Sequence, residues 1–262
     1  MFRKSVLWTF LPLSLTLAQN PPAPPPEPQA APASEPPSQA YVRRFSVGGT
    51  LSYLPFQFTT INSIDQTLTA NPPGHVSANS SPTKYHFSPA LNFQVALTEH
   101  IAIVVNGVYR RVAYAANWDY LLGILDPTSA VDNRSPFSVT EDTRAKFIDI
   151  PVLLRYYDKG RHRPGKRFFL EIGPTMRLVR YIHTTRNIID PEGNITTDTT
   201  PYSPRYKNLP GITAGAGMQF IDPVGIRVIP EVRLTQWRGA TFDTAPTRSN
   251  RSQLEVMISL NF

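Results

Sequence analysis

The feature that most constrains this chain is an alternation of apolar and polar residues with a period of two, repeated over eight segments. In the last segment, Leu254, Val256 and Ile258 fall on one face. Glu255 and Ser259 fall on the other. Because successive side chains of a β-strand point to opposite sides, the pattern predicts amphipathic strands. The predicted strands are 43–54, 84–97, 101–114, 143–157, 168–180, 206–220, 225–237 and 251–262.

The lengths of the strands and of their connections favour a membrane barrel. The strands have 12 to 15 residues, whereas soluble strands usually have about 5–6 and tilted membrane strands need about 9–11. Four long connections, 55–83, 115–142, 181–205 and 238–250, alternate with three short ones, 98–100, 158–167 and 221–224. Outer-membrane barrels combine long external loops with short periplasmic turns. We therefore predict an all-β fold, an eight-stranded antiparallel up-and-down transmembrane β-barrel in a bacterial outer membrane, with both termini in the periplasm.

The residues before the barrel have a different composition. Residues 1–18 combine Arg3 and Lys4 with a short apolar stretch and end on a small residue, which predicts a secretory signal peptide rather than a membrane anchor or a buried helix. Residues 19–42 contain nine prolines and predict a disordered, Pro-rich periplasmic linker. A proline-rich ligand for another domain is an equally open reading of that segment. The barrel domain is then 43–262.

Aromatic residues gather near the ends of the predicted strands. If the apolar face points outward, they form two girdles at the membrane–water interfaces. A soluble ligand-binding barrel would instead turn its aromatic residues inward and be richly charged outside. The external girdle is predicted at Tyr53, Tyr85, Tyr109 and Tyr206, and the periplasmic girdle at Phe45, Tyr156, Phe168, Phe220 and Phe262.

The inward face carries charges. An eight-stranded barrel is just wide enough for side chains to fill it, so these charges are expected to form an ionic network in the lumen. A packed plug and a narrow gated pore both remain open. Prolines inside the strands are expected to mark bulges, which would shift the inward assignment. The predicted lumen residues are Asp149, Glu171, Glu231, Glu255, Arg110, Arg155, Arg177, Arg227 and Arg233. Arg233 and Arg177 are the expected hubs of one network.

Several of these segments resemble a known family, the PorT-like, OmpA-like outer-membrane β-barrel domains. The resemblance covers 43–262 and implies an eight-stranded barrel in the outer membrane, without implying one activity. The C-terminal aromatic residue, Phe262, resembles the signal that the barrel-assembly machinery reads. The similar segments are FIDIPVLLRYY at 147–157, FFLEIGPTMRL at 168–178, GITAGAGMQF at 211–220 and PEVRLTQW at 230–237.

Catalytic and metal-binding patterns are thin. The chain has no Cys, so thiolate catalysis and Cys-ligated zinc are excluded. His86 and Ser88 share one strand face and suggest a lipid-modifying enzyme, but no G-x-S-x-G motif accompanies them. The acidic residues Asp190, Glu192 and Asp198 lack the spacing of a calcium loop. We expect no enzyme activity, cofactor or metal.

The expected function is that of a non-enzymatic outer-membrane scaffold with three long external loops and a side-chain-filled lumen. Its expected partners are outer-membrane lipids, the barrel-assembly machinery through the C-terminal strand, and an external ligand at the long loops. The net charge of +7 comes without a run of five basic residues, so no nucleic-acid partner is predicted. The alternatives are a narrow gated pore, an outer-membrane lipid-modifying enzyme and a soluble periplasmic ligand-binding barrel.

Overall fold

The computed structural model describes residues 43–61, 63–69, 73–83, 86–129, 131–163, 165–201, 203–222, 225–244 and 246–262. The predicted signal peptide, the whole predicted linker and Tyr85 lie outside the described residues. The described part is all-β, with 13 strands. Its residues include no helix long and apolar enough to cross a membrane.

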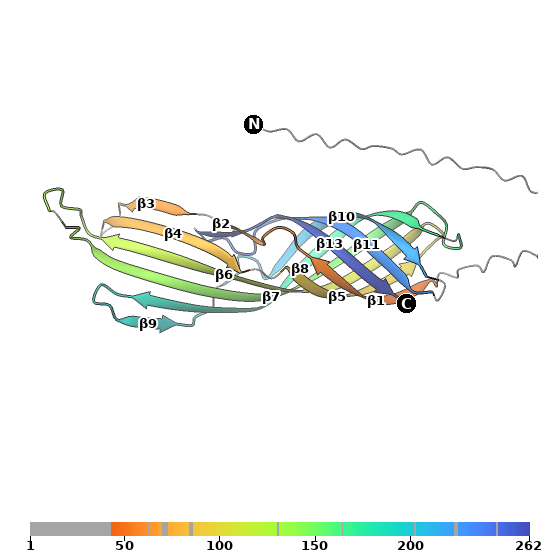
Figure 1. Cartoon of the computed structure of the whole chain (residues 1–262), viewed down its shortest axis with the longest axis horizontal. Coiled ribbons are helices and arrows are strands. Elements are labelled where there is room, and N and C mark those ends of the chain that lie inside the picture. Colours follow the sequence, from red (N-terminus) through yellow and green to blue (C-terminus); the bar gives the residue numbers. More distant parts are fainter. Residues whose placement is uncertain are drawn as a thin grey trace, which may run out of the picture. The chain divides into compact units, whose positions relative to one another are not determined.

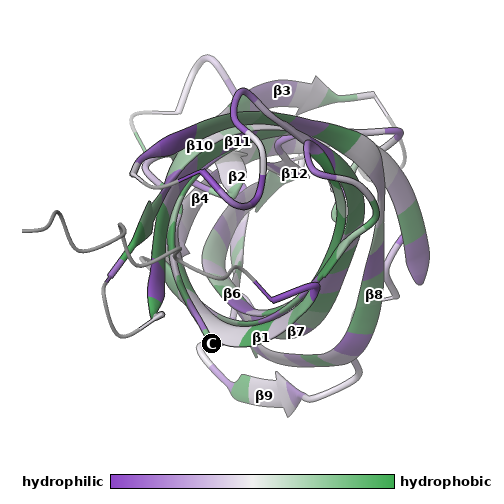
Figure 2. Cartoon of the chain, turned by 90° about the vertical axis from the view of Figure 1, so that its right-hand side faces the viewer, coloured by the Kyte–Doolittle hydropathy of each residue, from purple (hydrophilic) through white to green (hydrophobic). Residues whose placement is uncertain are grey.

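Eight antiparallel strands form a closed ring (Figures 1 and 2). Each strand pairs with the next ring strand in the sequence, the pairing of β6 with β7 makes the ring continuous, and β13 returns to β1. This is the up-and-down order that the sequence predicted. The ring strands are β1 (Phe45–Tyr53), β5 (Phe87–Ala96), β6 (Ile101–Leu122), β7 (Ser135–Tyr157), β8 (Arg167–Ile189), β10 (Asn208–Ile221), β11 (Arg227–Trp237) and β13 (Ser252–Asn261).

The two ends of the ring differ. At the short-turn end lie the connections 97–100, 158–166 and 222–226 together with Phe45 and Phe262. At the opposite end, here called the long-loop end, β6, β7 and β8 continue beyond the ring as a sheet extension (Figure 1). The strands β3 (Ile64–Leu68) and β4 (Gly74–Thr83) widen this extension beside β6, and β9 (Ile195–Asp198) widens it beside β8.

The extension corrects the prediction of three long loops at 55–83, 115–142 and 181–205. Much of these segments is β-strand, and β7 and β8 each have 23 residues. The strand β4, with the sequence GHVSANSSPT, shows why the pattern missed it. This sequence has no continuous apolar face, so it lacks the alternation by which a strand is recognised from a sequence.

Two short strands form a cover at the long-loop end. The strand β2 (Thr59–Ile61) pairs with β12 (Thr247–Ser249) in a separate two-stranded sheet. Backbone hydrogen bonds from Asn250 N to Phe58 O, 2.8 Å, and from Ser249 N to Phe242 O, 3.0 Å, hold the neighbouring residues in place. This two-stranded cover joins the connection after β1 to the connection after β11.

The ring has an apolar outside and a polar inside. Along β1 and β13, exposed and buried residues alternate strictly over most of each strand. Phe45 on β1 is 71% exposed and Ile212 on β10 is 62% exposed, whereas Arg155 on β7 is fully buried. The ring therefore reverses the usual arrangement of a soluble protein, in which the buried face is apolar.

The expectation that in-strand prolines mark bulges is wrong. The pairing register is unchanged across Pro89, Pro151, Pro174, Pro210 and Pro230. The register shift between β7 and β8 occurs instead at Lys146/Phe147. Proline removes one donor from a ladder, but its fixed φ angle is compatible with an extended chain, so pairing continues on both sides.

Glycines on the inward face of β10 leave room for large side chains from its neighbours. A Cβ atom on Gly215 would lie 2.9 Å from Glu171 Oε1 and 3.0 Å from Arg233 Cγ. A Cβ on Gly217 would lie 2.5 Å from Phe169 Cζ. The glycine-rich sequence of this strand is thus explained by the crowding of the lumen.

This crowding yields a prediction. The Gly215→Ala variant should lower the free energy of unfolding by about 1–3 kcal/mol, because the added methyl overpacks a filled interior. Urea unfolding of the barrel in lipid vesicles measures the change. Gly49→Ala is the matched control, since a Cβ there meets no atom within 4 Å. Equal stability of both variants would show that the lumen has room for the added methyl group, and it would contradict the prediction.

Candidate functional site

The structure buries all nine charged residues that the sequence assigned to the lumen. Each of them is at most 4% exposed and lies on the inward face of a ring strand. They come from β6, β7, β8, β11 and β13. Eight of the nine form ion pairs with one another, and these eight divide into two groups of four, described in turn below.

The first group, the upper quartet, consists of Arg110, Asp149, Arg177 and Glu255. Arg110 forms ion pairs with both Asp149 and Glu255. Arg177 donates from Nε and Nη2 to the two carboxylate oxygens of Asp149, each at 2.8 Å. Such a bidentate pair fixes the geometry of both side chains. The upper quartet therefore links β6, β7, β8 and β13 across the lumen.

The second group, the lower quartet, consists of Arg155, Glu171, Glu231 and Arg233 and lies nearer the short-turn end. Arg155 contacts Glu171 at 2.7 Å and Glu231 at 2.6 Å. Arg233 contacts Glu171 at 2.6 Å and Glu231 at 2.9 Å. Every acid thus meets both arginines. The ring of contacts joins β7, β8 and β11.

Each quartet contains two acids and two arginines and has no net formal charge. This balance matters because an uncompensated buried charge costs several kcal/mol. We expected Arg233 and Arg177 to be the hubs of one network. In the structure, Arg233 shares that role equally with Arg155, and Arg110 rather than Arg177 bridges two acids in the upper quartet.

The ninth predicted charge, Arg227, has no ion pair in the described part of the chain, although it is 2% exposed. It lies at the short-turn end, where Arg167 is also buried. Arg167 donates to two backbone carbonyls, those of Lys159 at 3.0 Å and Glu99 at 3.2 Å. Arg167 was not predicted as a lumen residue. It lies two residues before the inward Phe169, so the alternation places it on the inward face as well.

Aromatic residues cover the upper quartet from the long-loop end. Phe58 and Phe242, which flank the two-stranded cover, pack with Phe147 and Tyr114 in a buried apolar cluster. The Arg177 guanidinium lies 4.9 Å from the ring centre of Phe58 and 4.0 Å from that of Trp237. Arg177 thus contacts both the upper quartet and the aromatic residues beside the two-stranded cover. Phe58 and Phe242 were not predicted, because they come from connections without a strand pattern.

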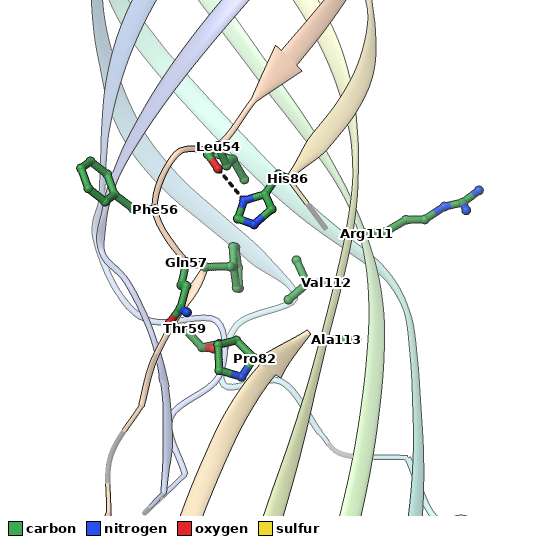
Figure 3. Close-up of a pocket in the computed structure, with 10 residues that line it drawn as sticks. Leu54, Phe56, Gln57, Thr59, Pro82, His86, Arg111, Val112 and Ala113 are labelled. Carbon is green, nitrogen blue, oxygen red and sulfur yellow. Dashed lines mark hydrogen bonds between the residues drawn. The ribbon is translucent and has the colours of Figure 1, made fainter. Parts of the chain in front are cut away.

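A small pocket lies in the wall where β4 ends and β5 begins (Figure 3). Its lining includes Leu54, Pro82, His86 and Val112. His86 Nδ1 lies 2.8 Å from Leu54 O, and Ser88 is buried. Among the described residues, no hydrogen bond joins His86 to Ser88, so the pair that suggested an enzyme is not assembled.

The girdle residues lie mainly where the strands end. Seven of the eight that the structure describes belong to a ring strand or end it directly. Tyr206 instead precedes β10, which begins at Asn208. All eight are exposed or half-buried on the outward side. The residues are Tyr53, Tyr109 and Tyr206 toward the long-loop end, and Phe45, Tyr156, Phe168, Phe220 and Phe262 at the short-turn end.

The acidic residues of the β8–β9 hairpin are engaged locally. Hydrogen bonds from Asn194 hold the pKa of Asp190 below its usual value. Hydrogen bonds from Thr200, and then the charge of Arg186, lower the pKa of Asp198. In the described ranges, no group of three His, Asp or Glu side chains could hold a metal ion.

Comparison with known proteins finds weak structural similarity. No family model matches the chain. No curated protein matches it. Neisserial surface protein A is 8% identical, with a TM-score of 0.35, and the match covers 84% of this chain and 95% of that one. Ail, the attachment invasion locus protein of Yersinia pestis, solved in complex with the heparin analogue sucrose octasulfate, is 7% identical, with a TM-score of 0.30 and coverage of 84% and 100%. These TM-scores are low. The barrel is therefore identified by its own strand pairings.

Proposed function

We propose that this protein is a non-enzymatic integral β-barrel of a bacterial outer membrane, with a plugged lumen and a β-sheet extension for interaction outside the cell. The observation that carries the proposal is the reversed ring, with exposed apolar residues outside and charged residues inside. A soluble barrel with this surface would leave a large apolar area in water. A membrane barrel places that area against lipid.

Fractionation tests the membrane assignment. The protein should stay with outer-membrane fractions after a carbonate wash, and it should migrate differently on a gel before and after boiling. Release into the wash as folded, soluble protein would contradict the proposal and favour a periplasmic ligand-binding barrel.

The proposed orientation places the sheet extension outside and both termini in the periplasm. It is supported by the short connections at the end where β1 begins and β13 ends. The chain would arrive there through the signal peptide at 1–18 and the Pro-rich linker at 19–42. Phe262, which ends the chain beside β1 and is 62% exposed, would provide the contact with the barrel-assembly machinery.

Protease treatment of intact cells tests this orientation. Proteinase K should cut the connection 123–134 between β6 and β7 at the tip of the extension, because its residues are mostly exposed. The connection 158–166 at the other end should be cut only after the outer membrane is permeabilised. Mass spectrometry of the fragments locates the cuts. Cleavage at 158–166 in intact cells would mean that the barrel is inserted the other way round.

Within this proposal, the barrel is a scaffold of the PorT-like, OmpA-like kind, and recognition belongs to the extension. A narrow gated pore is the second candidate, because two charged quartets line the bore. The plug is better supported. Both quartets are neutral and cross-linked between strands, and Phe58, which flanks the two-stranded cover, lies 4.9 Å from Arg177 of the upper one.

A further inference from the structure

Three cations lie together on the outward face, just beyond the apolar band. Arg111 on β6 and Lys146 on β7 are direct cross-strand partners, and Arg144 is the next outward residue on β7. All three side chains are exposed. Like charges placed directly opposite each other destabilise a sheet, so this arrangement calls for a compensating anion. With Tyr181 and His183 they line a surface cleft, here called the basic cleft.

The chain itself does not supply the anion. None of the three cations forms an ion pair with any residue that the structure describes. Two of them face aromatic rings instead: Arg111 lies 5.5 Å from the ring centre of Tyr109, and Lys146 lies 5.4 Å from that of Tyr181. These contacts leave the guanidinium and ammonium donors available. In Figure 3, Arg111 points away from the other labelled side chains.

The position of the basic cleft relative to the apolar band indicates the kind of anion. The next outward residue after Lys146 toward the short-turn end is Ile148, about 7 Å along the strand. Ile150 and the exposed Val152 follow on the same face. A ligand that contacts both regions must carry an anionic group directly above an apolar tail. That is the chemistry of a phosphorylated lipid.

Other cations extend this level around the ring. Arg180, Lys207, Arg238 and Arg251 are all exposed. They lie near the long-loop ends of β8, β10, β11 and β13 within the ring. The basic cleft differs from these single cations because three charges and two aromatic rings converge on one hollow.

We infer that the basic cleft binds the phosphate headgroup of a membrane lipid in the leaflet at the long-loop end, with the acyl chains against Ile148, Ile150 and Val152. The inference rests on the proposed function, since it requires the apolar band to lie in a membrane. The rings of Tyr109 and Tyr181 orient Arg111 and Lys146, respectively. His183, stacked on Tyr181 at 6.3 Å, borders the same cleft.

Lipid binding by the purified protein in nanodiscs tests the inference. The probe is diphosphorylated lipid A at low mole fraction in phosphatidylcholine, compared with the same lipid after enzymatic removal of its phosphates. The Arg111→Gln/Arg144→Gln/Lys146→Gln variant should bind the phosphorylated lipid about 100-fold more weakly, because each cation near a membrane surface contributes about fivefold. The dephosphorylated lipid should not distinguish the variant from the wild type.

Matched variants separate this site from general charge. The Lys159→Gln/Arg163→Gln/Lys166→Gln variant removes three cations from the short-turn end and should bind like the wild type. The charge-preserving Arg111→Lys/Arg144→Lys/Lys146→Arg variant should keep most of the binding, and it covers the case in which the glutamine variant fails to fold. Wild-type binding by the folded glutamine variant would overturn the inference.

Two further outcomes identify the source of failure. If millimolar inorganic phosphate displaces the lipid, the ligand is free phosphate and the lipid assignment is wrong. If the wild-type protein does not insert into nanodiscs at all, the membrane function fails and this inference fails with it. Insertion without selective binding of the phosphorylated lipid would overturn the inference alone.

Discussion

Replacing Glu231 with glutamine should lower the free energy of unfolding by about 3 kcal/mol, because it leaves two buried arginines with a single counter-charge, that of Glu171. Glu231 accepts from Arg155 at 2.6 Å and pairs with Arg233 at 2.9 Å. Its loss gives the lower quartet a net positive charge. Urea unfolding in lipid vesicles, followed by gel mobility without boiling, measures the change.

Glu192→Gln is the matched control, since Glu192 is exposed in the β8–β9 hairpin and the same atoms are exchanged. It should change stability by less than about 0.5 kcal/mol. A double-mutant cycle adds a sharper criterion. In the Arg233→Gln background the quartet becomes neutral again on removing Glu231, so the second substitution should cost less than it does alone. Additive losses would mean that the quartet does not act as a unit.

The lumen could be predicted because alternation is a local property of the chain. Once the apolar face of a strand is known, the inward position of Asp149 or Glu231 follows from parity alone. The parity also holds across Pro151 and Pro230, where bulges were expected, because the register is fixed by pairing on both sides. The division into two neutral quartets could not be predicted, since it depends on how far each arginine reaches across the barrel.

The two-stranded cover and the sheet extension could not be predicted from the apolar–polar alternation, for a different reason. Phe58 and Phe242 come from connections that carry no alternation, so nothing in the sequence placed Phe58 over Arg177 or Phe242 against Tyr114 and Phe147. The outer parts of β6, β7 and β8 lack the apolar outward face of the ring, so their polar residues resemble a loop. Arg227 has the inward parity of the quartet residues, but it forms no ion pair with any acid that the structure describes.

Planar bilayers that contain the wild-type protein should show no steady current. The two quartets and the aromatic side chains of Phe58 and Phe242 stand in series along one bore. An eight-stranded barrel is just wide enough for side chains to fill it. An ion must pass every layer to cross the barrel. When one layer is opened, the remaining layers still block the ion. The Phe58→Ala/Phe242→Ala variant removes these two rings and should still conduct no steady current, because both quartets remain.

Current should appear only when the layers are removed together. In a variant that combines the two alanines with serine at all eight quartet positions, the bore keeps its net charge but loses its long side chains, and discrete channel openings should be seen. Gel mobility without boiling checks that each variant is folded. Steady current through the alanine variant would mean that the quartets do not block ions and that the two-stranded cover is a gate. Current through the wild type would make the pore the primary function, because ions would then cross the lumen with both quartets and the cover in place.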